Sequence, residues 1–134
     1  MPSTTVLVDT NILSELARPR PSARVVAWAR TVARVSVSVI TLEEIHFGLA
    51  WKANARIRAW FVAFVNEHCK VHPVTAEIAT AAGLLRGALA ARGVRRTQAD
   101  MLIAATAQVE RLTLAARHTR DFSGCGIARH DPFA

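Results

Sequence analysis

The sequence is poor in cysteine and has neither a long uncharged apolar run nor the N-terminal pattern of a secretion signal. Its 134 residues include only Cys69 and Cys125, whereas small domains that depend on disulfides usually contain more cysteines. No window long enough to cross a bilayer is free of charge. Asp9 and Glu15 fall where a signal peptide would be basic and then apolar. These absences predict a cytoplasmic protein without a disulfide framework or a membrane anchor.

Internal repeats, low-complexity stretches and linkers are also absent from the sequence. The length suits one compact domain that spans residues 1–134 and leaves no room for a second. Because 51% of the residues are hydrophobic, an ordinary apolar core can form without disulfides.

Acidic residues are scarce relative to basic ones, 10 against 17, so the formal net charge is +7. The basic residues are spread from Arg18 to Arg129. Such a surface attracts polyanions through counterion release, which makes nucleic acid the first candidate partner. Solubility or an acidic protein partner explains the charge almost as well, and charge alone assigns no reaction.

Short apolar or β-branched runs alternate along the chain with longer segments of helical periodicity. We expect strands over residues 4–8, 35–39, 69–72, 112–115 and 127–129. We expect helices over residues 12–17, after a cap at Ser22, and over 41–51, 56–67, 75–91 and 97–110. Since the crossovers are long enough for parallel pairing, the predicted class is an α/β/α sandwich around a mainly parallel sheet of four to five strands.

Three acidic residues occupy the carboxyl ends of the expected strands or the first turns of helices. Asp9 directly follows the first strand, and Glu44 and Asp100 are expected in the first turns of the helices over 41–51 and 97–110. In open α/β sheets, ligands bind beyond the carboxyl ends of the strands. If the strand order brings these ends together, the three carboxylates converge on one crevice.

Helix capping is an alternative explanation for each of these acids taken singly. Thr41-x-x-Glu44 matches a capping box, Thr97-x-x-Asp100 resembles one with a shorter acid, and Asp9 suits an N-cap. Capping is the more common role for any one of them. The conjunction of the three, however, favours a shared site.

Converging carboxylates require a compensating positive charge. Unit charges about 5 Å apart repel each other by roughly 3 kcal/mol at an effective dielectric constant near 20. An all-oxygen site with few protein ligands suits Mg²⁺ or Mn²⁺ better than zinc. Such an ion lowers the pKa of a bound water and neutralises charge on a phosphodiester, so the predicted chemistry is phosphodiester hydrolysis.

Four segments of the sequence, in order, resemble the signature segments of PIN-domain proteins, specifically the VapC-like and FitB-like toxins. They read VLVDTNILSEL, SVITLEEIHFGLA, QADMLIAATA and TRDFSGCGIARHDPF. The resemblance implies that Asp9 and Asp100 are metal-binding carboxylates. It selects Glu44 as the acid between them, because Glu44 precedes Gly48 by four residues, and it leaves Glu43 on the surface.

The same resemblance assigns supporting roles near these acids and shows one departure from the family. Thr10 and Asn11 take the small polar positions that orient ligands and cap the helix. At the fourth acidic position the sequence has His118, where an Asp or Asn is expected, and Asp121 follows one turn later. We predict a weaker or water-mediated catalytic role for Asp121. His118 is predicted to bind the substrate phosphate or, as a lesser alternative, a metal ion; an ordinary surface histidine is the plain explanation.

By resemblance, the function is that of a Mg²⁺-dependent endoribonuclease toxin, with Mn²⁺ as the alternative ion, that blocks translation by cutting single-stranded RNA. The implied partners are a small DNA-binding antitoxin, a second copy of the toxin in a homodimer, and operator DNA held through the antitoxin. A catalytically silent PIN-like module that binds RNA or protein is the main alternative, since the fourth acidic position is altered. A DNA-directed nuclease is less favoured because such chains usually contain helical insertions.

Two other groups of residues are given structural explanations. His68 and His72 have a spacing that holds zinc on a helix, with Cys69 between them, but Pro73 argues against a helix there. Three tryptophans fall on helical segments among apolar residues, which favours the core or a dimer interface over stacking on bases. They are Trp28, Trp51 and Trp60.

Overall fold

The computed structural model describes residues 5–134, in which a five-stranded sheet lies at the centre of the fold. The strands are β1 (Thr5–Val8), β2 (Arg34–Ser38), β3 (Cys69–His72), β4 (Thr113–Ala115) and β5 (Arg129–His130). All are parallel, in the order β3-β2-β1-β4-β5. The predicted α/β class with a mainly parallel sheet is confirmed. Thr4, which was expected to begin the first strand, lies outside the described residues.

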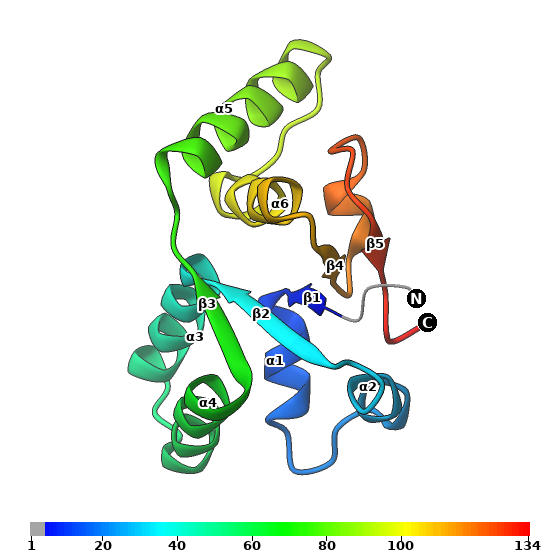
Figure 1. Cartoon of the computed structure of the whole chain (residues 1–134). Helices are drawn as coiled ribbons and strands as arrows, with labels where there is room; N and C mark the ends of the chain where they lie inside the picture. The colour runs from blue at the N-terminus through cyan, green and yellow to red at the C-terminus, as the bar shows by residue number, and fades with distance from the viewer. Residues whose placement is uncertain (1–4) are drawn as a thin grey trace.

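Helices cover both faces of this sheet (Figure 1). They are α1 (Thr10–Leu16), α2 (Ala23–Ala29), α3 (Val39–Trp51), α4 (Ala55–His68), α5 (Ala76–Ala91), α6 (Gln98–Glu110) and the short 3-10 helix η1 (Thr119–Phe122). Figure 1 shows α5 and α6 together on one side of the sheet and α1, α2 and α4 on the other. The expected elements exist, with bounds that agree to within two residues at each end.

The central strand β1 separates two hydrophobic clusters. Leu7 packs with residues of α5 and α6, whereas Val6 and Val8 pack with residues of α1, α2 and α4. Successive side chains of a strand point to opposite faces, so a run of apolar residues serves both layers. Because β1 is buried on both faces, it is held firmly in the core, and so is the backbone of Asp9 directly after it.

The start of α3 differs from the sequence prediction. The helix begins at Val39 with Ser38 as its N-cap, whose hydroxyl accepts from the backbone N–H of Ile40 at 3.0 Å. The predicted capping box is therefore wrong, because Thr41 is fully buried inside the helix. Glu44 also lies beyond the first turn, in which no acidic residue is found. Ser38 is both the last residue of β2 and the N-cap of α3, so the helix begins two residues earlier than predicted.

The three tryptophans have different environments. Trp28 and Trp60 are partly buried and pack against the hydrophobic cluster that includes residues of α1, α2 and α4. Trp51 is 74% exposed on α3, next to Phe47, which is 62% exposed. A core role for Trp51 is therefore wrong, while an interface role remains a prediction.

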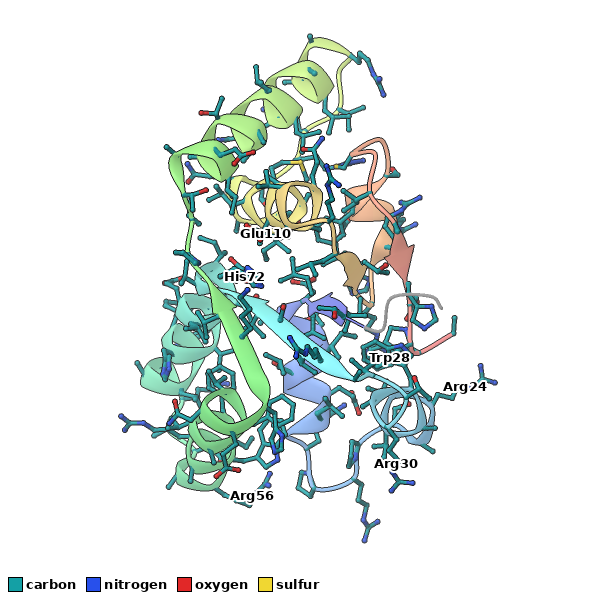
Figure 2. The ribbon with its side chains drawn as sticks, in the orientation of Figure 1. Arg24, Trp28, Arg30, Arg56, His72 and Glu110 are labelled. Carbon is teal, nitrogen blue, oxygen red and sulfur yellow. The ribbon has the colours of Figure 1, made fainter. Side chains whose placement is uncertain are left out.

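His72 is a buried residue of β3, so the helical zinc spacing is not formed. Its Nε2 lies 2.9 Å from the Ser36 hydroxyl, and its Nδ1 lies 3.9 Å from Glu110 of α6 (Figure 2). Burial lowers the pKa of His72, which favours the neutral ring. Within the described residues, moreover, no helix has the length and apolarity that a membrane span needs.

Candidate active site

The strand order brings together acids that are far apart in the sequence. β1 lies between β2 and β4, so Asp9 at its carboxyl end is flanked on one side by α3, which directly follows β2. On the other side β4 leads into η1, which contains Asp121. This is the edge of the sheet where α/β proteins bind ligands.

Asp9 is both the N-cap of α1 and a nearly buried acid. Its Oδ1 accepts a hydrogen bond from the Thr10 backbone N–H at 2.8 Å, and its residue exposure is 8%. Its own N–H donates to the Ala115 carbonyl at 2.9 Å, next to the last pair between β1 and β4. The backbone on both sides of Asp9 is therefore fixed.

The electrostatic surroundings of Asp9 are unfavourable for a carboxylate. Burial is the largest cause that raises its pKa to about 6; the charges of Asp100, Glu44 and Asp121 raise it further, and the Thr10 N–H opposes them. The charges of these three acids therefore act on Asp9. A group with this pKa at a ligand-binding edge is typical of a functional site.

Asp100 lies in the first turn of α6, as expected, and is half-buried. Its backbone N–H donates to the hydroxyl of the N-cap Thr97 at 3.1 Å. Burial raises the pKa of the Asp100 carboxyl, with the Asp121 charge adding to the rise, while the Thr97 hydroxyl and Arg96 act in the opposite direction. Asp100 thus combines a capping position with a place in the acidic cluster.

A hydroxyl chain connects α1 to Glu44. The Thr10 hydroxyl donates to Glu44 Oε1 at 2.7 Å and lies 3.3 Å from the hydroxyl of buried Thr41. Glu43 is exposed, whereas Glu44 is partly buried at this contact. This hydrogen bond occupies Oε1 of Glu44 and leaves Oε2 of the carboxylate available.

The remaining predicted site residues lie at or beside the cluster. Asp121 is exposed on η1 and its charge reaches both Asp9 and Asp100. His118 immediately precedes η1 and is also exposed, without a side-chain capping bond to the turn. Asn11 is exposed in the first turn of α1, whose N-cap is Asp9 instead.

Two residues at the cluster were missed by the sequence analysis. Thr41 was interpreted only as a cap, although its place within an apolar stretch signalled that it is buried. Arg96 approaches Asp100 and binds the residues around Asp121, and no sequence signal distinguishes it from the neighbouring Arg95.

The donor chemistry of the cluster fits a hard divalent cation. Four carboxylates supply only oxygen donors, and their mutual repulsion favours a cation between them. Among residues 5–134, no three side chains of His, Cys, Asp or Glu lie close enough to form a complete ligand set. Mg²⁺ is usually held by one or two carboxylates and several waters, and the carboxylates of this edge offer donors of that kind.

The fold is that of a PIN-type α/β protein. The sequence profile described as the PIN domain matches residues 6–124, so the chain belongs to the PIN domain family.

Two named relatives cover nearly the whole chain. Toxin FitB of Neisseria gonorrhoeae is 30% identical, with 96% of this chain and 98% of FitB aligned. VapC ribonuclease Y4jK of Sinorhizobium fredii is 28% identical, with 96% and 97% aligned. The chain is similar in structure to the crystal structure of DNA-bound VapBC from Salmonella typhimurium, with a TM-score of 0.82, 26% identity and coverage of 96% of this chain and 98% of the other. The predicted membership of the PIN family with VapC-like and FitB-like toxins is confirmed.

Proposed function

We propose that this chain, as one PIN domain over residues 1–134, is the toxin of a toxin–antitoxin pair and a metal-dependent endoribonuclease that inhibits translation. The observation that carries the proposal is the position of Asp9, a buried acid at the carboxyl end of the central strand, next to Thr10, whose hydroxyl binds Glu44 of α3 at 2.7 Å; the charges of Glu44, Asp100 and Asp121 raise the pKa of Asp9. The relatives named as a toxin and a ribonuclease support the same activity.

In the proposed site, Asp9, Glu44 and Asp100 hold one Mg²⁺ or Mn²⁺ ion, partly through waters, and Asp121 acts through water. The bound ion supplies a more acidic water and neutralises charge on the phosphodiester. Thr10 fixes the rotamer of Glu44 through its 2.7 Å hydrogen bond. Each carboxylate oxygen that accepts no protein hydrogen bond is available to orient a water.

The charge of the chain is suited to a polyanionic substrate. The net charge is +7, and Figure 2 shows Arg24 of α2 and Arg30, its C-cap, pointing outward from the molecule. Contacts of arginine with phosphates are independent of base sequence. We propose that RNA is bound mainly through its backbone, with exposed His118 available for one phosphate.

The proposed partners are an antitoxin and a second toxin. By analogy with DNA-bound VapBC, a small antitoxin covers the acidic crevice and holds the pair on operator DNA, and the complex works in the cytoplasm. The exposed Phe47 and Trp51 on α3 support self-association as a homodimer. Release of the antitoxin is expected to raise ribonuclease activity. A complex that cuts RNA as fast as the free toxin would contradict inhibition by occlusion.

The test is cleavage of a labelled single-stranded RNA by the purified chain with and without Mg²⁺. We expect cleavage that disappears with excess EDTA and in Asp100→Asn. The matched pair Glu44→Gln and Glu43→Gln checks the assignment of the acid on α3, because only Glu44 accepts from Thr10. Glu44→Gln is expected to lose at least ~10²-fold in activity, on the scale of a lost electrostatic contact in a transition state, and Glu43→Gln to retain it.

A catalytically silent RNA- or protein-binding module is the second candidate. It is favoured by His118, which stands at the fourth acidic position where an Asp or Asn is expected. RNA binding without cleavage at high protein concentration, unaffected by EDTA, would establish this module and exclude the enzyme.

A further inference from the structure

Arg96 connects two parts of the candidate site that come from different elements. It lies just before Thr97, the N-cap of α6, and so within four residues of Asp100. Its guanidinium donates to the Ser123 carbonyl at 3.1 Å, to the Ser123 hydroxyl at 3.3 Å and to the Arg120 carbonyl at 3.5 Å. These acceptors lie on either side of Asp121 in the sequence, so one side chain ties the Asp100 helix to the Asp121 turn.

The turn that contains Asp121 needs such a restraint. η1 is a four-residue 3-10 helix, and the hydrogen-bond geometry of such turns is poorer than that of an α-helix. The charge of Asp121 raises the pKa of both Asp9 and Asp100, and like charges push the turn away from them. Buried Phe122 anchors the turn to the core, but a single apolar anchor does not fix the rotation of the turn about it.

Polar contacts complete the attachment on two sides. Arg129 of β5 donates to the Thr119 carbonyl at 2.8 Å, at the beginning of the turn. Arg96 binds its end, where the Ser123 hydroxyl and N–H also donate to the Arg120 carbonyl at 2.9 and 3.1 Å. Arg129 belongs to β5, whereas Arg96 directly precedes the N-cap of α6, the helix that contains Asp100. Of the two arginines, only Arg96 therefore links the turn to Asp100.

We propose that Arg96 is a positioning residue, which sets the separation of Asp100 and Asp121 and thereby the affinity of the acidic site for a divalent cation. This inference rests on the proposed metal-dependent function. Arg96 does not touch the metal or the substrate in this role; it acts through the backbone of the turn.

If Arg96 acted only through its charge, its removal would change the affinity for a cation in the opposite direction. The direction of the change therefore tests the inference. A guanidinium near an acidic site repels a cation, so removal of its charge alone would tighten cation binding. Loss of a positioning contact weakens binding, and loss of a residue that orients metal ligands typically costs 10-fold to 100-fold in metal affinity. Arg95, which is exposed and adjacent in sequence, provides a control of equal charge.

The experiment measures the dissociation constant of Mn²⁺ by titration calorimetry for the full chain and for Arg96→Ala, Arg96→Lys and Arg95→Ala. We expect Arg96→Ala to bind Mn²⁺ at least ~10-fold more weakly and Arg95→Ala to bind it as the wild type does or slightly more tightly. Arg96→Lys keeps the charge but not the forked geometry, so its affinity should remain reduced. Circular dichroism of each variant checks that the fold is intact.

A double-mutant comparison assigns the effect to Asp121. If Arg96 acts through that residue, Arg96→Ala in an Asp121→Asn background changes the affinity less than it does in the wild type. Equal losses in both backgrounds, or an Arg96→Ala variant that binds Mn²⁺ as tightly as the wild type or more tightly, would overturn the positioning role alone. A wild-type chain that binds no Mn²⁺ would overturn both this inference and the metal-dependent function.

Discussion

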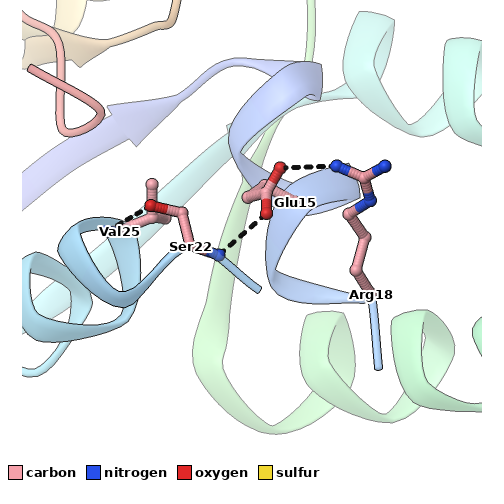
Figure 3. A network of polar contacts seen from close by, with 4 residues as sticks. All are labelled: Glu15, Arg18, Ser22 and Val25. Carbon is pink, nitrogen blue, oxygen red and sulfur yellow. Dashed lines mark hydrogen bonds and ion pairs between the residues drawn. The ribbon is translucent and has the colours of Figure 1, made fainter. Parts of the chain in front are cut away.

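The two ends of α1 each have a buried acid, and the two acids have opposite surroundings. Glu15, 7% exposed, accepts from the Ser22 N–H at 2.8 Å and from Arg18 at 3.2 Å (Figure 3). Asp9, 8% exposed, accepts from the Thr10 N–H, and the charges of Asp100, Glu44 and Asp121 raise its pKa. Similar burial thus accompanies a compensated charge at one end and an uncompensated charge at the other.

The difference indicates what each acid does. Glu15 holds the chain as it turns from α1 through Pro19 and Pro21 to the N-cap of α2, a structural role that its partners satisfy fully. Asp9 has one backbone donor and no basic group that lowers its pKa among residues 5–134, so its carboxylate is less stable without a cation. Local arrangements that cost stability are typical of functional sites.

The largest effect that separates the two acids is on activity. Asp9→Asn keeps the N-cap, because Asn also accepts from the Thr10 N–H, but removes the charge needed to hold a cation. We expect RNA cleavage to fall by at least ~10²-fold, as in the loss of one electrostatic contact in a transition state. Single-turnover cleavage rates at saturating Mg²⁺ measure this effect. An Asp9→Asn variant with at least a tenth of the wild-type rate would remove Asp9 from the catalytic site.

The same substitution should stabilise the metal-free chain. Burial raises the pKa of Asp9 to about 6, above its ordinary value of 3.8, so the folded state binds an extra proton between these two pH values. The stability contributed by this proton is present below pH 4 and is lost as the pH rises through 6, a change of about 3 kcal/mol. Urea unfolding in EDTA should show Asp9→Asn more stable than the wild type at pH 8, with the difference vanishing near pH 4. A difference that is independent of pH would contradict this account.

Glu15→Ala should do the reverse of Asp9→Asn. It leaves the Ser22 N–H without its acceptor and removes a partner of Arg18; an unsatisfied buried donor costs about 1–3 kcal/mol. Urea unfolding should show this loss, with RNA cleavage per folded molecule unchanged. Arg18→Ala is the control: because Arg18 is 65% exposed, its removal should cost less than 1 kcal/mol.

The smallest expected effect concerns Thr10, which connects the acidic end of α1 to α3. Thr10→Val removes the hydroxyl that donates to Glu44 but keeps the shape of the side chain. We expect a loss of roughly 10-fold in cleavage rate, on the scale of one hydrogen bond to a charged group. Thr10→Ser restores the hydroxyl and should recover most of the rate. A Thr10→Val variant with full activity would show that Glu44 needs no orientation.

The sequence predicted the order and type of the elements because residues typical of helix caps mark most of the helix starts. Ser22, Thr75 and Thr97 each cap the helix that was expected to begin there. The α3 boundary was missed because two cap-forming residues, Ser38 and Thr41, lie three apart. The choice between them depends on how far β2 pairs with β3, which is a long-range contact.

The candidate site could be predicted only where residue type and position were both distinctive. Asp9 directly follows a strand, and Asp100 lies in the first turn of a helix. Both signals are local in the sequence. The partners of Arg96 lie 24 and 27 residues away in the sequence, and the 2.7 Å contact between Thr10 and Glu44 joins residues 34 apart. Such contacts depend on how elements pack, and a single sequence contains no record of them.

The pairing of β1 with β4 also determines when, during synthesis of the chain, the acidic edge is completed. Asp9 leaves the ribosome early, but the strand beside it and the turn with Asp121 are among the last parts to emerge. A chain that stops before β4 has Asp9, Glu44 and Asp100 and the paired strands β1, β2 and β3, but it lacks the strand that holds the other side of β1 and the turn with Asp121. The acidic edge is therefore complete only after residues 113–122 have been made.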